Sequence, residues 1–157
     1  MSASTQKSAS NMPLQSKAKV SKVNNGLVDS YRKEMAKTLT ALLAGTYRLT
    51  IKSHIAHWNV SGPLFKPLHE LTEGHYNALF AAADVIAERI RALGHLAPVN
   101  VSDVATFAPK SGSAETDTAQ IMVEDLISDH EAATRSMRSA FAAAEQGDDP
   151  VTADMLT

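Results

Sequence analysis

Five side chains of the type that bind metal ions occur in one stretch of the sequence. They are His57, His69, Glu73, Asp84 and Glu88, at successive spacings of 12, 4, 11 and 4 residues. Imidazole and carboxylate groups four residues apart share one face of a helix, and they are suitable ligands for a hard or borderline divalent cation. The chain has no cysteine, so any metal that it binds must be held by oxygen and imidazole nitrogen. The spacing therefore predicts a metal site built on helices.

Helix geometry divides these ligands into two groups. On one α-helix His69, Glu73, Asp84 and Glu88 fall within about 100° of one another around the axis, yet Glu73 and Asp84 are about 16 Å apart along it. One rigid helix cannot bring both pairs to a single centre. His57 lies near the end of the preceding helix and faces the start of this one. We therefore expect His57, His69 and Glu73 to form one half-site, and the acid pair to need another partner.

A second copy of the chain can supply the missing half. Two copies packed antiparallel about a twofold axis near residues 78–79 would place the acid pair of one opposite the half-site of the other, giving two equivalent sites per dimer. Open coordination positions and oxygen-rich ligation with imidazole favour iron or manganese over a closed zinc site. Taken singly, such a histidine more often has a structural role and such an acid pair is more often solvated. The metal interpretation depends on all five residues together.

Two long helices are expected to position these side chains. Apolar residues recur at three- and four-residue steps from about residue 27 to residue 60, and Ser61, Gly62 and Pro63 then end that helix. A second helix is expected from about residue 65 to Leu93, with Gly94 as its C-terminal stop. Because the link between them is so short, the two helices must form an antiparallel hairpin.

The second half of the chain is also expected to be helical. Residues 95–115 contain prolines and small polar residues and predict a long connection, with a short helix over 102–107. A third helix is expected over about 116–146, and Asp149 and Pro150 are typical of the start of a fourth. Only about two turns follow before Thr157, so we expect the natural protein to continue by about 20 residues or more. The fold class is all-α, a four-helix bundle over residues 27–157 whose fourth helix is largely missing from the sequence.

Charge is distributed unevenly along the chain. The formal net charge is −2, but residues 1–26 carry four lysines and no acid, while the remaining residues carry 11 basic and 17 acidic groups. We interpret residues 1–26 as a disordered tail. Its lysines could bind DNA phosphates weakly and without sequence preference, or the tail could simply be solubilising. No apolar run is long enough for a membrane span or a secretory signal, so a cytoplasmic protein is expected. The four basic residues are Lys7, Lys17, Lys19 and Lys22.

Two sequence motifs resemble those of the Dps family, the miniature ferritins. One is the HW-x-V-x-G stretch that begins at His57 and leads to Leu68, His69 and an acid four residues on; the other is the D-x-I-A-E-R stretch from Asp84 to Arg89, followed by Leu93 and Gly94. The resemblance covers about residues 27–157. It implies a ferritin-like four-helix bundle, a dodecamer around a cavity, and a di-iron ferroxidase centre at the twofold interface. The implied ligands are His57, His69 and Glu73 of one subunit and Asp84 and Glu88 of its neighbour. Position 73 is commonly Asp in the family.

The chemistry implied by this resemblance is iron oxidation and storage. Ferrous iron would be oxidised, preferably by hydrogen peroxide, ferric mineral would accumulate in the cavity, and DNA would be protected from oxidative damage. Trp58 is interpreted either as core packing or as a side chain that absorbs a stray oxidising equivalent. Acids on the third helix would line a pore, or else form a solvated face. An architectural DNA-binding oligomer and a non-enzymatic metal-binding bundle remain as alternatives. The candidate pore residues are Glu124, Asp125, Asp129 and Glu131.

Overall fold

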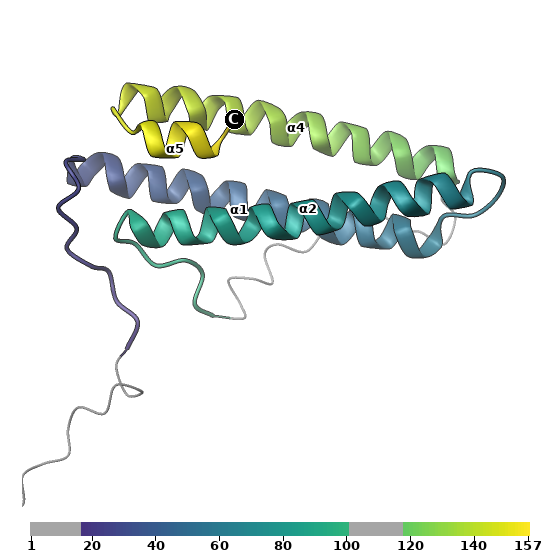
Figure 1. The fold of residues 1–157 in the computed structure, drawn as a ribbon, viewed down its shortest axis with the longest axis horizontal. Coiled ribbons are helices and arrows are strands. Elements are labelled where there is room, and N and C mark those ends of the chain that lie inside the picture. Colours follow the sequence, from purple (N-terminus) through teal and green to yellow (C-terminus); the bar gives the residue numbers. More distant parts are fainter. Residues whose placement is uncertain (1–16, 101–117) are drawn as a thin grey trace, which may run out of the picture.

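The computed structural model describes residues 17–100 and 118–157. Within these ranges the chain forms four α-helices and no strand, which confirms the predicted all-α class (Figure 1). The predicted short helix over 102–107 and the side chain of Lys7 lie outside the described residues. The helices are α1 (Asp29–Asn59), α2 (Phe65–Ala92), α4 (Ala119–Gln146) and the short α5 (Pro150–Met155).

The predicted hairpin is formed by α1 and α2, which run antiparallel along most of their length (Figure 1). The chain reverses through Ser61, Gly62 and Pro63. Gly62 has a φ of +89°, a conformation in which a residue without Cβ is not strained. Gly45, in the middle of α1, does not interrupt the helix. The boundaries of the hairpin therefore follow from local residue preferences, as expected.

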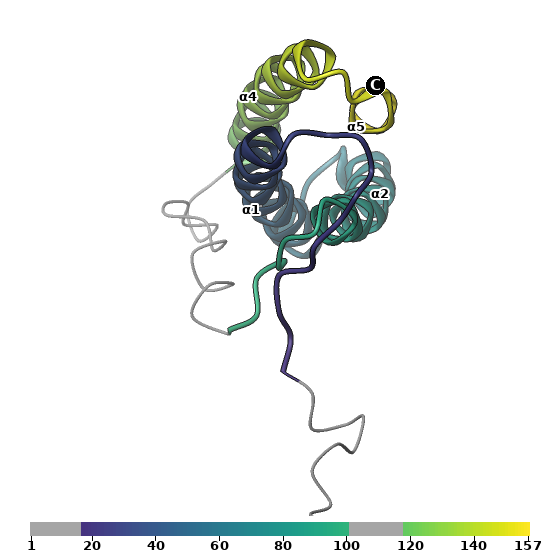
Figure 2. The same cartoon turned by 90° about the vertical axis from the view of Figure 1, so that its left-hand side faces the viewer.

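The remaining helices complete a bundle around the hairpin. Seen from one end, the helices follow the order α2, α1, α4 and α5 around the bundle (Figure 2). The short α5 folds back along α4 and occupies the fourth corner at this end (Figures 1 and 2). Thr118 caps α4 by accepting a hydrogen bond from the backbone N–H of Ile121, and Gly147 ends it. Asp149 and Pro150 begin α5, which confirms the predicted start of a fourth helix.

The core is divided between the two ends of the bundle. The larger cluster lies at the end that α5 covers, and its most deeply buried members include Leu39, Ile90 and Leu93. A smaller cluster joins α1 to the first half of α4. Each fully buried aliphatic side chain contributes about 1.5–3 kcal/mol to the stability of the folded state, relative to an exposed one. The hairpin is therefore anchored most firmly near the C-terminal end of α2. The smaller cluster consists of Leu49, Ala56, Met122 and Leu126.

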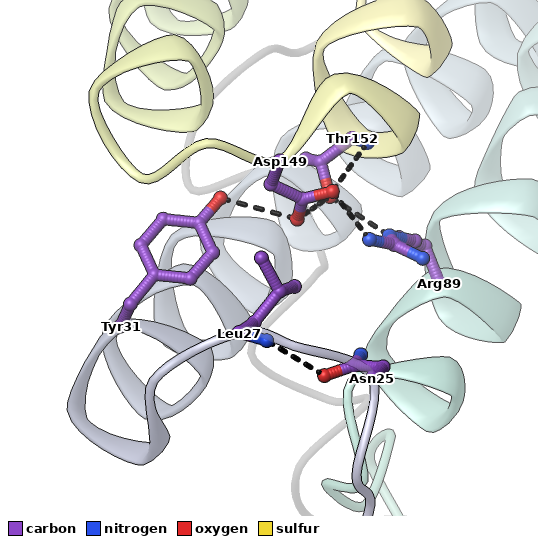
Figure 3. Close-up of polar contacts among 6 residues, drawn as sticks. All are labelled: Asn25, Leu27, Tyr31, Arg89, Asp149 and Thr152. Atoms are coloured by element: carbon purple, nitrogen blue, oxygen red, sulfur yellow. Dashed lines mark hydrogen bonds and ion pairs between the residues drawn. The ribbon is translucent and has the colours of Figure 1, made fainter.

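A buried polar network holds α5 on the hairpin (Figure 3). The Asp149 carboxylate accepts hydrogen bonds from Arg89 Nη2 at 2.6 Å and from Tyr31 Oη at 3.1 Å. It also accepts from the backbone N–H and the hydroxyl of Thr152 at 3.0 and 2.5 Å, while Arg89 Nε donates to the Thr152 hydroxyl at 2.8 Å. We call these four residues the Asp149 network. The network joins α1, α2 and α5, and it gives the arginine of the D-x-I-A-E-R motif a structural role.

The hydrogen bonds of the Asp149 network stabilise the charged form of the Asp149 carboxylate. Burial alone would raise the pKa of Asp149, but hydrogen bonds from Thr152 and Arg89 outweigh it and lower the pKa below its ordinary value. Burial, followed by the neighbouring Asp149 charge, raises the pKa of Tyr31 well above its ordinary value. Tyr31 is therefore a neutral donor, and Asp149 an ionised acceptor, throughout the neutral pH range.

The segment before α1 packs across the end of α2 (Figure 2). The backbone N–H of Ser21 donates to the Gly94 carbonyl at 2.8 Å, and Arg32 Nη1 donates to the Leu93 carbonyl at 3.0 Å. Residues 17–26 contain no helix, and the side chains of Lys17, Lys19 and Lys22 are exposed. The last part of the predicted tail is therefore attached to the bundle at Ser21.

Gly94→Ala is expected to destabilise the protein by about 1–3 kcal/mol. Gly94 has a φ of +90°, and an added Cβ would lie 2.7 Å from the Ser21 carbonyl oxygen. The matched control is Gly45→Ala in α1, where the nearest heavy atom is 3.8 Å away and the better helix former should stabilise by about 0.5–1 kcal/mol. Thermal unfolding of the two variants checks the pair. Equal melting temperatures for Gly94→Ala and the wild type would contradict the packing of Ser21 on Gly94.

Candidate metal centre

The end of α1 and the start of α2 bring His57 and His69 together. Their rings stack with centroids 3.6 Å apart and an interplanar angle of 20°. His57 Nδ1 hydrogen-bonds to the His69 carbonyl at 2.9 Å, and His69 Nδ1 hydrogen-bonds to the His57 carbonyl at 2.8 Å. A carbonyl oxygen can only accept, so each Nδ1 carries the proton and donates it. The two helices therefore hold the two imidazoles reciprocally.

This arrangement leaves both histidines ready to bind a metal. With Nδ1 donating to a carbonyl, Nε2 is the ring nitrogen that can offer a lone pair to a metal. A hydrogen bond from the second nitrogen to a carbonyl is the usual way in which a protein orients a metal-binding histidine. Two imidazoles on one tetrahedral ion would have centroids about 5 Å apart, given metal–nitrogen distances of about 2.0–2.1 Å. The 3.6 Å separation of His57 and His69 is shorter, which favours a separate ion for each ring.

Aromatic side chains surround the histidine pair. Phe65 stacks on His69 with centroids 5.0 Å apart, and Tyr76 meets the His57 ring edge-on at 5.3 Å. The ring centroids of Tyr76 and His54 are 3.9 Å apart, and His54 in turn stacks on Trp58 with centroids 5.2 Å apart. These contacts were not predicted, because the partner rings of Phe65, Tyr76 and His54 are not part of the helix-spaced ligand pattern.

Trp58 is part of this aromatic group but not of the core. Its side chain is 68% exposed, so the core-packing interpretation is wrong for the single chain. The chain of ring contacts runs from Trp58 through His54 and Tyr76 to His57. Trp58 is therefore connected to the candidate centre through other rings, and its redox role stays a prediction.

The three acids lie along α2 and form no three-ligand group with the histidines. Glu73, Asp84 and Glu88 are all exposed. In the described part of the chain, no three histidine, aspartate or glutamate side chains come close enough to share an ion. Glu73 was expected to form one group with His57 and His69, and within the single chain these three do not form such a group. The division of the five ligands between two subunits stays a prediction. Phe80 and Val85, which flank Asp84 on the same helix, are 61% and 50% exposed. Exposed apolar side chains beside carboxylates are typical of a surface that another protein covers.

The acids proposed for a pore take part in ion pairs or hydrogen bonds within the chain. Lys52 of α1 pairs with Asp125 at 2.5 Å and also with Asp129. Burial alone would lower the pKa of Lys52, but hydrogen bonds to the two carboxylates outweigh it and raise the pKa. Glu124 accepts a hydrogen bond from Gln120, and Glu131 lies 3.7 Å from Arg135. A pore lining remains a prediction, with one partly buried cation, Lys52, balancing part of its charge.

The fold and this pair of histidines define a class of protein. The sequence matches the model of the ferritin-like domain over residues 36–157, which is most of the chain. The solved structure of a Dps protein from Bacillus brevis has a TM-score of 0.73 and 30% identity, covering 81% of this chain and 85% of that one. The chain is therefore a ferritin-like protein. Among the described residues, no helix has both the length and the apolar character needed to cross a membrane.

Sequence relatives narrow this class. A low temperature-induced protein of Nostoc is 36% identical over 141 residues, covering 87% of this chain and 77% of the relative. The DNA protection during starvation protein 1 of Deinococcus radiodurans is 33% identical over 140 residues, covering 85% and 68%. The chain belongs to the Dps family, as its two motifs predicted. Iron storage, ferroxidase activity and DNA protection are general functions of that family, and its members are oligomeric.

Proposed function

We propose that this protein is a cytoplasmic ferroxidase and iron-storage protein that oxidises ferrous iron with hydrogen peroxide and keeps the ferric product inside a dodecamer. The observation that carries this proposal is the reciprocal hydrogen bonding of His57 and His69, which presents both Nε2 atoms as ligands. Membership of a ferritin-like family supports iron as the metal substrate.

The complete centre is proposed to form between subunits. His57, His69 and Glu73 of one subunit bind iron together with Asp84 and Glu88 of its neighbour. Three observations support this division: no three such ligands meet among the described residues, the acids are exposed, and apolar side chains flank them. Glu73 is one methylene longer than aspartate, so it has additional reach toward an iron near His69.

The proposed reaction consumes two ferrous ions for each peroxide. Each iron gives up one electron, the O–O bond breaks, and with two protons the products are two ferric ions and two waters. Because both electrons arrive together from adjacent irons, no hydroxyl radical is released. The two histidines orient the irons, and the carboxylates balance the added positive charge. Trp58 and Tyr76 would donate an electron if only one iron were present, sparing DNA from the oxidant.

Ferrous iron added without oxygen, followed by peroxide, is expected to give ferric absorbance much faster with the protein than in buffer. About two irons should be oxidised per peroxide. His69→Asn should slow the reaction by about 100-fold or more, because it removes a metal ligand. His95→Asn, near the opposite end of α2, serves as the control and should behave as wild type. Oxidation no faster than in buffer would overturn the proposed enzyme activity.

DNA binding is a second proposed activity, favoured by the exposure of Lys17, Lys19 and Lys22. Changing these three lysines and Lys7 to Gln should weaken DNA binding and reduce its salt slope by about 0.9 for each phosphate that is no longer neutralised. Gel-shift titrations at several salt concentrations measure both effects. Lys33→Gln, an exposed lysine on α1, is the control. Unchanged binding by the four-lysine variant would show that the tail does not bind DNA, and would leave the iron chemistry unaffected.

A further inference from the structure

A second pair of histidines lies away from the candidate iron centre. His75 of α2 and His130 of α4 meet with ring centroids 5.1 Å apart and an interplanar angle of 69°. His75 is six residues after His69, which turns it about 120° away from the ligand face of α2. The pair lines an open pocket of about 540 Å³ whose other lining residues are Ile127, Glu131, Thr134, Arg135 and Arg138. It therefore belongs to a different face of the bundle.

Both histidines have a ring nitrogen without a hydrogen-bond partner. His75 Nδ1 and His130 Nε2 are buried, and neither finds a donor or acceptor among the described residues. A buried polar atom without a partner costs roughly 1–3 kcal/mol, so most such atoms in folded proteins are satisfied. Two such atoms on adjacent rings suggest that one ligand satisfies both.

The ring geometry indicates what that ligand is. Two imidazoles bound to one tetrahedral ion, at metal–nitrogen distances of about 2.0–2.1 Å, place their centroids about 5 Å apart. His75 and His130 have this separation, whereas the stacked His57 and His69 rings do not. If the two rings were hydrogen-bonded to each other, His75 Nδ1 and His130 Nε2 would have partners. Neither atom has one, so a ring-to-ring hydrogen bond does not explain why the rings lie together.

We propose that His75 and His130 form a second metal site, which binds one borderline divalent cation such as Zn²⁺ in each subunit. Imidazole nitrogen suits zinc and copper better than it suits calcium or magnesium, which prefer oxygen. Two coordination positions remain for water, because among the described residues no third histidine, aspartate or glutamate side chain lies close enough to share the ion.

The proposed ion connects two helices that otherwise touch little. In the end view α2 and α4 lie diagonally across the bundle, and their packing is mainly against α1 (Figure 2). An ion held by one residue from each helix would tie the two together. The site is therefore expected to stabilise the bundle and to take no part in iron oxidation.

Zinc binding to the full chain tests this proposal. Zn²⁺ alone should raise the melting temperature of the wild type and of His57→Ala, because a ligand that binds only the folded state stabilises it. The rise should be clearly smaller in His130→Asn and in His75→Asn, because only zinc at the iron centre remains, and unchanged in the control His95→Asn. Equilibrium dialysis should find one zinc fewer per subunit in either variant than in the wild type.

The variants also separate this site from the iron centre. His57→Ala should lose zinc bound at the iron centre but keep the thermal effect, and His130→Asn should keep full ferroxidase activity. If a histidine variant fails to fold, ring ¹H–¹⁵N spectra of the wild type should still show zinc-dependent shifts of His75 and His130. The proposal is overturned if these resonances do not move, or if His130→Asn binds as much zinc as the wild type with the same thermal effect.

Discussion

His57→Ala and Asp84→Ala proteins, each inactive alone, are expected to regain about a quarter of wild-type ferroxidase activity when they are unfolded, mixed in equal amounts and refolded. Each variant lacks a ligand in both centres of its own dimer, so its activity should fall by about 100-fold or more. In a mixed dimer one centre combines the intact histidines of one subunit with the intact acids of the other. Iron oxidation rates before and after mixing measure the effect.

The control for this experiment is a mixture of His57→Ala with His69→Ala. Both substitutions fall in the same half-site, so every centre in every mixed dimer lacks a histidine and no activity should return. Equal outcomes for the two mixtures would show that the ligands do not cross an interface. The comparison does not depend on the size of the oligomer, because each centre is shared by only two subunits.

Asp149→Ala is expected to destabilise the protein by about 3–5 kcal/mol, because it leaves the buried Arg89 guanidinium without its partner. It also removes the N-cap of α5 and an acceptor for Tyr31. For a chain of this size the melting temperature should fall by about 10 °C. The control Asp154→Ala removes an exposed carboxylate from the same helix and should change the melting temperature little. A similar loss in both variants would contradict a special role for the Asp149 network.

Acid should reduce the contribution of the Asp149 carboxylate to the free energy of unfolding. The pKa of Asp149 is lower in the folded protein than in the unfolded chain, so its contribution is fully present above the unfolded pKa of about 3.9. The contribution is lost as the pH falls from there through the lower folded pKa. The stability gap between wild type and Asp149→Asn, measured by urea unfolding, should therefore be constant near neutrality and narrow below about pH 4. A gap that widened in acid would contradict the direction of the pKa change.

Local signals accounted for most of the fold. The turn at Gly62, the stop at Gly94 and the start of α5 at Asp149 were predictable because each depends on the conformational preference of a few adjacent residues. The Asp149 network was not predictable in the same way. It joins Asp149 to Tyr31, which is 118 positions away, and to Arg89, which is 60 positions away. No periodic pattern in the sequence relates these residues.

The candidate iron site was partly predictable for a similar reason. Ligand spacing and hairpin geometry predicted that His57 and His69 lie close together, and the structure places them so. Both of these signals depend on residue types that can be read from the sequence. Their hydrogen bonds to backbone carbonyls leave no trace in the sequence, because every residue has a carbonyl. The partly buried position of Lys52 between two acids of α4 likewise depends on how α1 packs against α4.

The carbonyl partners of His57 and His69 also affect how this protein can evolve. A histidine oriented by a carboxylate side chain loses its orientation when that one residue mutates. Here the acceptors are backbone oxygens, which every amino acid provides. Substitutions around the site can therefore accumulate without disturbing the two imidazoles, provided that the hairpin keeps its register. Variation in the neighbouring side chains can then adjust the chemistry of the centre while its histidines stay in place.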